Sequence, residues 1–229
     1  MLAYNLTQNG PPIVLAAGLR SPWARAGGAF KHEDAGHLGG SVARELISRT
    51  GLDPAVLDEV IVGCVGPPHD QANIARVIAL RAGVPQSVPA RTVARNCASG
   101  IESVTSAIAN IRAGFGDTYL TMGVEVMSGY PLIMGRRLTG FFERMMKSRG
   151  LGQQLGTMLS FRPSMLKPRV ALLEGLTDPI SGMIMGNTAE LIAREFGLSR
   201  DLCDGFALRS HERAIAATNR GRFENEILP

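Results

Sequence analysis

At residues 91–100 the chain reads Arg91-Thr92-Val93-Ala94-Arg95-Asn96-Cys97-Ala98-Ser99-Gly100. The β-branched residues at the start of this segment predict a short strand. Apolar residues then recur at helical spacing, at Ile101, Val104, Ala107, Ile108 and Ile111. Cys97 therefore falls near a helix N-terminus, where unpaired backbone N–H groups and the helix dipole favour a thiolate. With small neighbours that let a substrate approach closely, this layout is typical of an acyl-transfer site.

The same alternation of strand and helix extends outward from this segment. Apolar runs predict strands at residues 12–17, 59–65, 89–94 and 118–124. Helical spacing predicts helices at residues 39–49, at residues 71–82 and after Cys97. Such alternation predicts an α/β fold, with a parallel or mixed sheet and helices on both faces. Active sites in these sheets gather at the carboxyl ends of strands, which is where Cys97 lies.

The character of the sequence changes near residue 130. Between Ile133 and Val170 there are eight Lys or Arg residues and a single acid, Glu143. The spacing of apolar residues there predicts amphipathic basic helices that end near Pro163 and Pro168. Two more helices are predicted at residues 185–196 and 200–220. We expect residues 1–129 to form one α/β domain and residues 130–229 a second, mainly helical one.

Composition excludes several classes of protein. With 229 residues, of which 45% are hydrophobic, the chain can bury a core in one or two domains. It has no apolar run long enough to span a membrane, and its N-terminus does not resemble a secretory signal. No G-x-G-x-x-G fingerprint for a dinucleotide occurs. The basic stretch at residues 133–170 shows no aromatic stacking pattern and no known nucleic-acid-binding module, so nucleic acid is not an expected partner.

The cysteines point to a reducing compartment. The chain has three cysteines, an odd number, at Cys64, Cys97 and Cys203, and no two of them form a C-x-x-C pair. This pattern predicts neither a disulfide scaffold nor a zinc site. We expect no bound metal, and a cytoplasmic protein (or one of the mitochondrial matrix in a eukaryote). Cys64, inside a predicted strand, and Cys203, inside a predicted helix, are typical of inert packing residues.

Three longer segments contain the residues of known motifs, in the same order along the chain. They are Asn96-Cys97-Ala98-Ser99-Gly100, Met122-Gly123-Val124-Glu125-Val126-Met127-Ser128 and Met185-Gly186-Asn187-Thr188-Ala189-Glu190. With shorter matches at residues 19–22, 71–76, 199–211 and 221–227, they resemble the thiolase family. Met122 stands where the family's G-G-x-E-x-M-S-like turn has its first glycine. The long basic segment resembles the branch that forms the β-subunit of fatty-acid oxidation complexes.

The resemblance implies a duplicated fold of two similar α/β halves, with a loop domain inserted in the first. Residues 1–129 resemble the first half and residues 130–229 an incomplete loop domain. The family's C-terminal half carries an N-E-A-F-like segment, a G-H-P-like histidine and a C-x-G-like second cysteine. We expect that half, with all three segments, to be absent from this chain. The resemblance also implies a homodimer formed through residues 118–124.

The implied reaction transfers an acyl group between a 3-ketoacyl-CoA and CoA, by thiolysis or by the reverse condensation, as in β-oxidation. Cys97 would carry the acyl group, while a histidine activates it and a second cysteine moves the α-proton of acetyl-CoA. Coenzyme A is then a substrate and no cofactor is needed. Because members of a catalytic set act together, we expect the isolated chain to be inactive unless a complementary chain supplies the missing half.

Other side chains have both a functional and a structural interpretation. Met127 and Met185 lie on matched segments that approach the acyl pocket, although methionine also fills cores. We expect Glu125 to orient backbone rather than to act as a base. The basic segment, residues 133–170, could bind the nucleotide end of CoA, contact an anionic membrane or a partner subunit, or form a solvated face.

Two other functions remain open at this point. One is a ketoacyl-synthase-like condensing enzyme, which the matches at residues 185–190 and 199–211 argue against. The other is a non-catalytic subunit or fragment with a thiolase fold. The retention of Cys97 in its motif argues against this alternative, and the expected loss of the C-terminal half argues for it.

Overall fold

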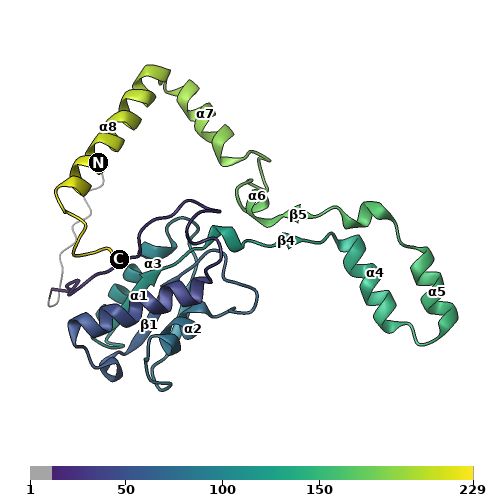
Figure 1. Ribbon diagram of the computed structural model, residues 1–229, viewed down its shortest axis with the longest axis horizontal. Coiled ribbons are helices and arrows are strands. Elements are labelled where there is room, and N and C mark those ends of the chain that lie inside the picture. The colour runs from purple at the N-terminus through teal and green to yellow at the C-terminus, as the bar shows by residue number, and fades with distance from the viewer. Residues whose placement is uncertain (1–11, 229) are drawn as a thin grey trace. The chain divides into compact units, whose positions relative to one another are not determined.

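The computed structural model describes residues 12–228. These residues form two compact units (Figure 1). The first extends to Gly129 and resumes at Arg213, and the second is Tyr130–Glu212. No helix between residues 12 and 228 is long and apolar enough to span a membrane.

A parallel three-stranded sheet forms the centre of the first unit. Strand β1 (Glu59–Gly63) lies between β2 (Ala90–Val93) and β3 (Tyr119–Gly123). Both neighbours run parallel to β1, with Val60 opposite Ala90 and Leu120. The unbroken apolar run of β1 is typical of a strand buried on both faces. The predicted parallel sheet is therefore confirmed.

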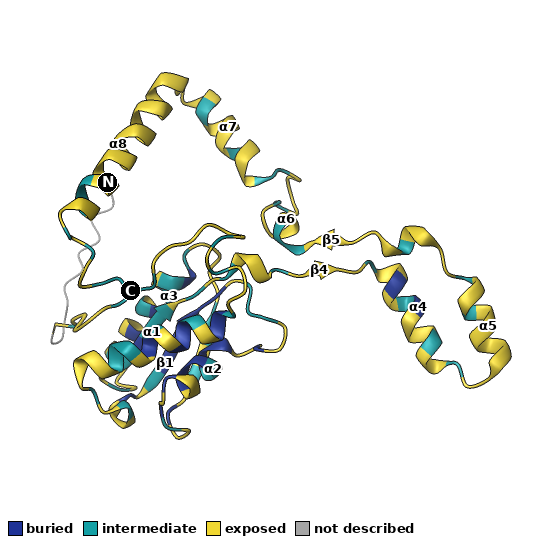
Figure 2. Ribbon diagram, viewed as in Figure 1, coloured by how far each residue is buried: buried dark blue, intermediate teal, exposed yellow. Residues whose placement is uncertain are grey.

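Helices cover both faces of this sheet, as predicted. Helices α1 (Ala35–Thr50) and α2 (Ile74–Arg81) pack together on one face, against a core that includes Val60 and Val62. Ile61 points to the opposite face, which α3 (Ser99–Arg112) covers. Figure 2 shows that the buried residues of this unit are concentrated in and around the sheet.

Helix α1 begins earlier than the apolar spacing predicts, because Asp34 caps it. The Asp34 carboxylate accepts hydrogen bonds from Gly36 N (2.8 Å) and Gln71 Nε2 (2.7 Å). It also forms an ion pair with Arg81 (2.6 Å), which ties α1 to α2. Partial burial raises the pKa of Asp34, but the hydrogen bonds from Gln71, Arg81 and Gly36 outweigh it and leave the pKa below its ordinary value.

The predicted strand at residues 12–17 is wrong. These residues form no strand, and Val14 and Leu15 are exposed. A strand needs a neighbour to complete its hydrogen bonds, and only the isolated bridge of Arg20 with Ile227 follows this segment. An apolar run alone does not supply that neighbour.

The second unit is mainly helical, as predicted. Two short strands, β4 (Leu132–Ile133) and β5 (Arg169–Val170), pair antiparallel. The segment between them contains α4 (Arg136–Lys147) and α5 (Leu151–Leu159). Helices α6 (Ala171–Gly175) and α7 (Met185–Glu195) follow, and α8 (Arg200–Asn219) leads back into the first unit. Short 3₁₀ turns lie at Pro54–Val56 (η1), Met127–Gly129 (η2) and Pro163–Leu166 (η3).

Candidate active site

Cys97 lies on a tight turn between β2 and α3. Asn96, just before it, has a φ of 47° and is the one non-glycine residue between 12 and 228 in the left-handed region. Asparagine tolerates that region better than most residues. The Ser99 hydroxyl locks the turn, because it accepts from Arg95 N (2.8 Å) and donates to the Asn96 carbonyl (2.7 Å).

The turn leaves the Cys97 thiol accessible at the start of a helix. Cys97 is exposed, and no residue between 12 and 228 forms a hydrogen bond with its thiol. No side chain caps α3, whose N-cap residue is Ala98. Ala98 N and Ser99 N already donate to the carbonyls of Arg95 and Asn96, both at 3.0 Å. The uncapped start of the helix favours negative charge near the thiol through its dipole.

Glycines let this turn lie directly on the ends of two strands. Gly63 ends β1, and a methyl group there would lie 2.7 Å from the backbone nitrogen of Gly100 and closer still to the Ser99 carbonyl. Gly123 ends β3, and a methyl group there would lie 2.9 Å from Gly100 Cα. The first turn of α3 is thus held at the carboxyl edge of the sheet, where sequence analysis predicts the site.

Glu125 fastens the loop after β1 to the end of β3. Its carboxylate accepts hydrogen bonds from Val65 N (2.9 Å) and Gly66 N (3.2 Å). Glu125 therefore orients backbone, the role expected for it. No local sequence pattern predicts these partners, which are 60 and 59 residues from Glu125. The same holds for the glycine contacts, because they also join segments that are distant in the chain.

Cys64 is a packing residue in this structure. It is buried at the end of β1, with its Sγ 4.0 Å from the Glu125 carboxylate oxygens. Burial, followed by the charge of Glu125, raises the pKa of the Cys64 thiol to about 11. The thiol is therefore protonated at neutral pH and cannot act as a nucleophile there.

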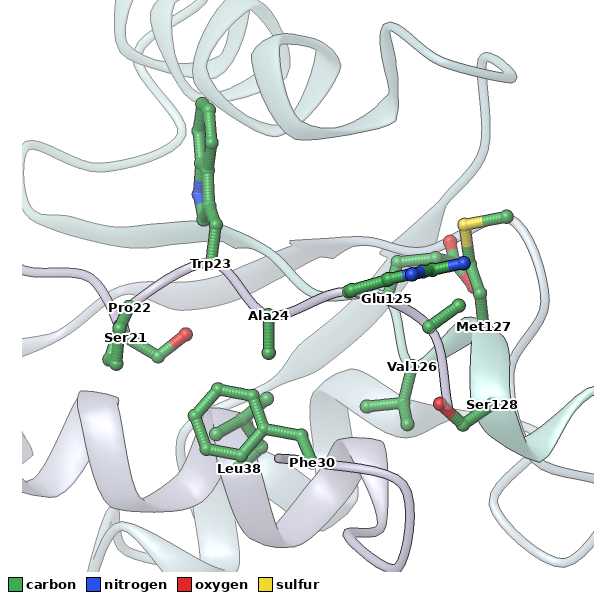
Figure 3. A pocket seen from close by; sticks show the side chains of 12 residues that line it. Ser21, Pro22, Trp23, Ala24, Phe30, Leu38, Glu125, Val126, Met127 and Ser128 are labelled. Atoms are coloured by element: carbon green, nitrogen blue, oxygen red, sulfur yellow. The ribbon is translucent and has the colours of Figure 1, made fainter. Parts of the chain in front are cut away.

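A pocket of about 200 Å³ lies beside Met127 (Figure 3). Residues 21–26, Glu125 and Met127 form part of its wall, and Phe30 and Leu38 lie below Ala24 in the view. A hydrogen bond from Gly27 N to Ser128 Oγ (2.9 Å) joins the two segments. Met127 is 44% exposed, but Cys97 does not line this pocket. Met127 therefore lines a pocket to which Cys97 does not contribute.

The remaining candidates lie elsewhere. Met185 begins α7 in the second unit and is 49% exposed. The letters C-x-G do occur in this chain, at Cys64-Val65-Gly66 and Cys203-Asp204-Gly205, so they cannot by themselves identify a second catalytic cysteine. In the first, Cys64 is buried directly after β1 and Val65 is exposed, and the second lies exposed within α8. Among residues 12–228, no group of three or more His, Cys, Asp or Glu side chains could hold a metal ion.

A family model described as the thiolase N-terminal domain matches residues 13–229. The chain belongs to the thiolase family. Over 217 residues it is 37% identical to a probable acetyl-CoA acyltransferase of Staphylococcus aureus (strain COL), covering 95% of this chain and 50% of that protein. The resemblance to the thiolase family predicted from the motifs is confirmed.

Two solved thiolase-fold structures agree with the α/β architecture. The crystal structure of the Bacillus anthracis acetyl-CoA acetyltransferase has a TM-score of 0.80 and 33% identity, and covers 94% of this chain and 50% of that one. Human mitochondrial 3-ketoacyl-CoA thiolase in complex with CoA has a TM-score of 0.76 and 28% identity, covering 92% and 49%. This thiolase chain spans about half the length of the curated relatives it matches.

Proposed function

We propose that this chain supplies the nucleophile of a thiolase-type acyltransferase, with Cys97 as the acyl acceptor. The observation that carries the proposal is the Asn96 turn, which presents an exposed thiol at the uncapped start of α3 and at the carboxyl edge of the sheet. Cys64 and Cys203 do not have this setting. Cys64 is buried with a raised pKa, and Cys203 lies within a helix.

The proposed substrates are a 3-ketoacyl-CoA and CoA. The Cys97 thiolate attacks the 3-keto carbon, and the bond between carbons 2 and 3 breaks. Its electron pair leaves with the acetyl-CoA enolate, which then takes up a proton. The thiol of CoA attacks the Cys97 thioester and releases the shortened acyl-CoA. The reverse sequence is condensation.

Other groups of this mechanism come, in our proposal, from outside residues 1–229. They are the histidine that activates Cys97 and the cysteine that moves the α-proton. A second thiolase half, in the same or another polypeptide, would provide them. We also propose a homo-oligomer, with β3 at the edge of the described sheet as the strand nearest the interface. In the thiolytic direction the reaction shortens fatty acyl chains, as β-oxidation requires.

Alkylation kinetics test the role of Cys97, and the chain contains its own controls. We expect iodoacetamide at neutral pH, applied to the protein purified with every chain that accompanies it, to label Cys97 faster than Cys203, although both are exposed, and to leave Cys64 unlabelled in the folded protein. Peptide mapping over time measures the three rates. Labelling of Cys97 no faster than that of Cys203 would argue against the proposal and favour a non-catalytic subunit.

A further inference from the structure

Ser99, the first residue of α3, is bonded to two residues that precede the nucleophile. Its hydroxyl accepts a hydrogen bond from Arg95 N (2.8 Å) and donates one to the Asn96 carbonyl oxygen (2.7 Å). Both partners come before Cys97 in the chain, and Ser99 comes after it. One side chain therefore bridges the Cys97 turn, which we define as residues 95–99.

The backbone at Asn96 explains why this turn needs support. Asn96 has a φ of 47°, and an L-residue in the left-handed region is strained, although asparagine tolerates it better than most. The Asn96 carbonyl oxygen accepts hydrogen bonds from both the backbone nitrogen (3.0 Å) and the hydroxyl (2.7 Å) of Ser99. These bonds hold the peptide group that joins Asn96 to Cys97 in one orientation.

Ser99 is itself fixed in place, so the turn is held from its helical end. The residue is 4% exposed. Its carbonyl group lies so close to Gly63, at the end of β1, that no methyl group would fit between them. A side chain that packing has already restricted loses little further freedom when it forms hydrogen bonds. The Ser99 hydroxyl is therefore a rigid support for the turn.

A second link across the turn is weaker. Arg95 Nε forms an ion pair with a carboxylate oxygen of Glu102 (3.0 Å), which also lies on α3. The Arg95 side chain is 69% exposed, and ion pairs in contact with solvent contribute little to stability. The Ser99 hydroxyl is shielded from water, which makes its hydrogen bonds the more effective constraint.

We propose that Ser99 is a positioning residue for acyl transfer. Its hydroxyl holds Asn96 in the left-handed region and so keeps the Cys97 thiol at the start of α3. This inference rests on the proposed role of Cys97 as the acyl acceptor. Ser99 acts through the backbone on the upstream side of Cys97, not by contact with the substrate. A nucleophile displaced by about 1 Å can react about a hundredfold more slowly, so one backbone constraint is sufficient to control acylation.

Ser103 provides a matched control on the same helix. It is fully buried (0% exposed), and its hydroxyl donates to the Gly100 carbonyl oxygen at 2.7 Å. This bond joins residues three apart, as does the bond from Ser99 to Asn96. The Ser103 bond lies wholly within α3, whereas the Ser99 bonds cross Cys97. Replacing either serine with alanine removes a buried hydroxyl, but the Ser99 variant alone loses the support of the turn.

Single-turnover acetylation tests the proposal in the protein purified with every chain that accompanies it. With acetyl-CoA as the acyl donor, Ser99→Ala should lower the maximal rate of thioester formation on Cys97 about tenfold or more. The acetyl-CoA concentration that gives half this rate should stay the same, because a positioning residue does not bind the donor. Ser103→Ala should change neither quantity by more than about twofold, although it also loses a buried hydrogen bond.

Two further measurements separate positioning from a general loss of structure. Glycine adopts positive φ values about as readily as negative ones. Asn96→Gly in a Ser99→Ala background should therefore recover part of the lost rate, because the turn then needs less support. In the wild type, the Arg95 amide hydrogen should exchange at least about tenfold more slowly than an unbonded amide, although Arg95 is exposed. Residue-resolved hydrogen exchange measures this rate without any variant.

Several results would overturn the proposal. Equal effects of Ser99→Ala and Ser103→Ala on the maximal rate are one, and an Arg95 amide that exchanges like an unbonded one is another. A further loss of rate on adding Asn96→Gly would show that the hydroxyl does not act through the left-handed residue.

Failure of the proposed function gives a different result. If the wild type forms no thioester, Cys97 is not the acyl acceptor, but hydrogen exchange and iodoacetamide labelling still decide whether Ser99 positions the thiol. Ser99→Ala should slow the labelling of Cys97 several-fold, because the thiol then leaves the helix start that favours a thiolate. Ser103→Ala should leave the labelling rate as in the wild type. Equal labelling rates in the two variants would contradict the positioning role.

Discussion

Replacing Gly63 with alanine changes one hydrogen for a methyl group at the point where β1 meets α3. The new carbon would lie 2.7 Å from Gly100 N and closer to the Ser99 carbonyl group. All of these are backbone atoms, so no side-chain rotation can relieve the contact. The first turn of α3 must move away from the sheet, and the Cys97 turn must move with it.

The size of the effect follows from this contact. Overpacking a core costs about 1–3 kcal/mol when neighbouring side chains can shift. Because backbone must shift here, we expect the upper end, about 3 kcal/mol of unfolding free energy. For a domain of this size each kcal/mol lowers the melting temperature by about 2–4 °C, so the expected fall is about 6–12 °C.

Thermal unfolding followed by circular dichroism measures this fall. The matched control is Gly129→Ala in the same unit, where an added methyl group meets nothing within 4 Å. The control should keep the wild-type melting temperature or raise it slightly. Gly63→Ala should also change the rate at which iodoacetamide labels Cys97. A Gly63→Ala protein that melts and labels like the control would refute the argument that glycine packing positions the site.

Three further predictions concern ionisable groups. Hydrogen bonds from the backbone N–H groups of Thr118 and Asp117 hold the pKa of Asp58 below its ordinary value. The ionised carboxylate therefore stabilises the fold above about pH 4, and this stabilisation is lost as the pH falls further and Asp58 is protonated. Asp58→Asn should be less stable at neutral pH and its stability should depend less on acid pH, as urea unfolding at a series of pH values would show. The pKa of the Cys64 thiol is about 11 in the folded protein, against a reference value of 9.0. The free energy of unfolding of the wild type should therefore fall as the pH rises from about 9 to about 11, and Cys64→Ala should not show this fall. Glu125→Gln should lower the pKa of Cys64, because it removes the nearby negative charge. The change can be measured by thiolate absorbance in a variant that lacks Cys97 and Cys203.

Sequence patterns predicted the elements whose burial is continuous or periodic. The apolar run at residues 59–65 gave β1 to within two residues, and helical spacing located α3. The start of α1 was predicted too late, because its first turn is rich in glycine and its cap, Asp34, carries no apolar signal. The error at residues 12–17 has a related cause. Apolar content indicates burial but not which strand provides the hydrogen-bond partner.

The site could be predicted only in part. The position of Cys97 follows from a local change of pattern, so the sequence was sufficient for it. The contact of Gly63 with the Ser99 carbonyl and the hydrogen bonds of Glu125 join segments distant in the chain, and no local pattern predicts them. Met127 lines a pocket without Cys97, although the two residues lie on neighbouring motif segments.

The central claim is that Cys97 accepts the acyl group. The most direct measurement incubates the protein, purified from its own cells with every chain that accompanies it, with acetyl-CoA and then maps its peptides by mass spectrometry. The account predicts an acetyl thioester on the Cys97 peptide and none in Cys97→Ser. An unmodified Cys97, or an equal adduct on Cys203, would contradict it.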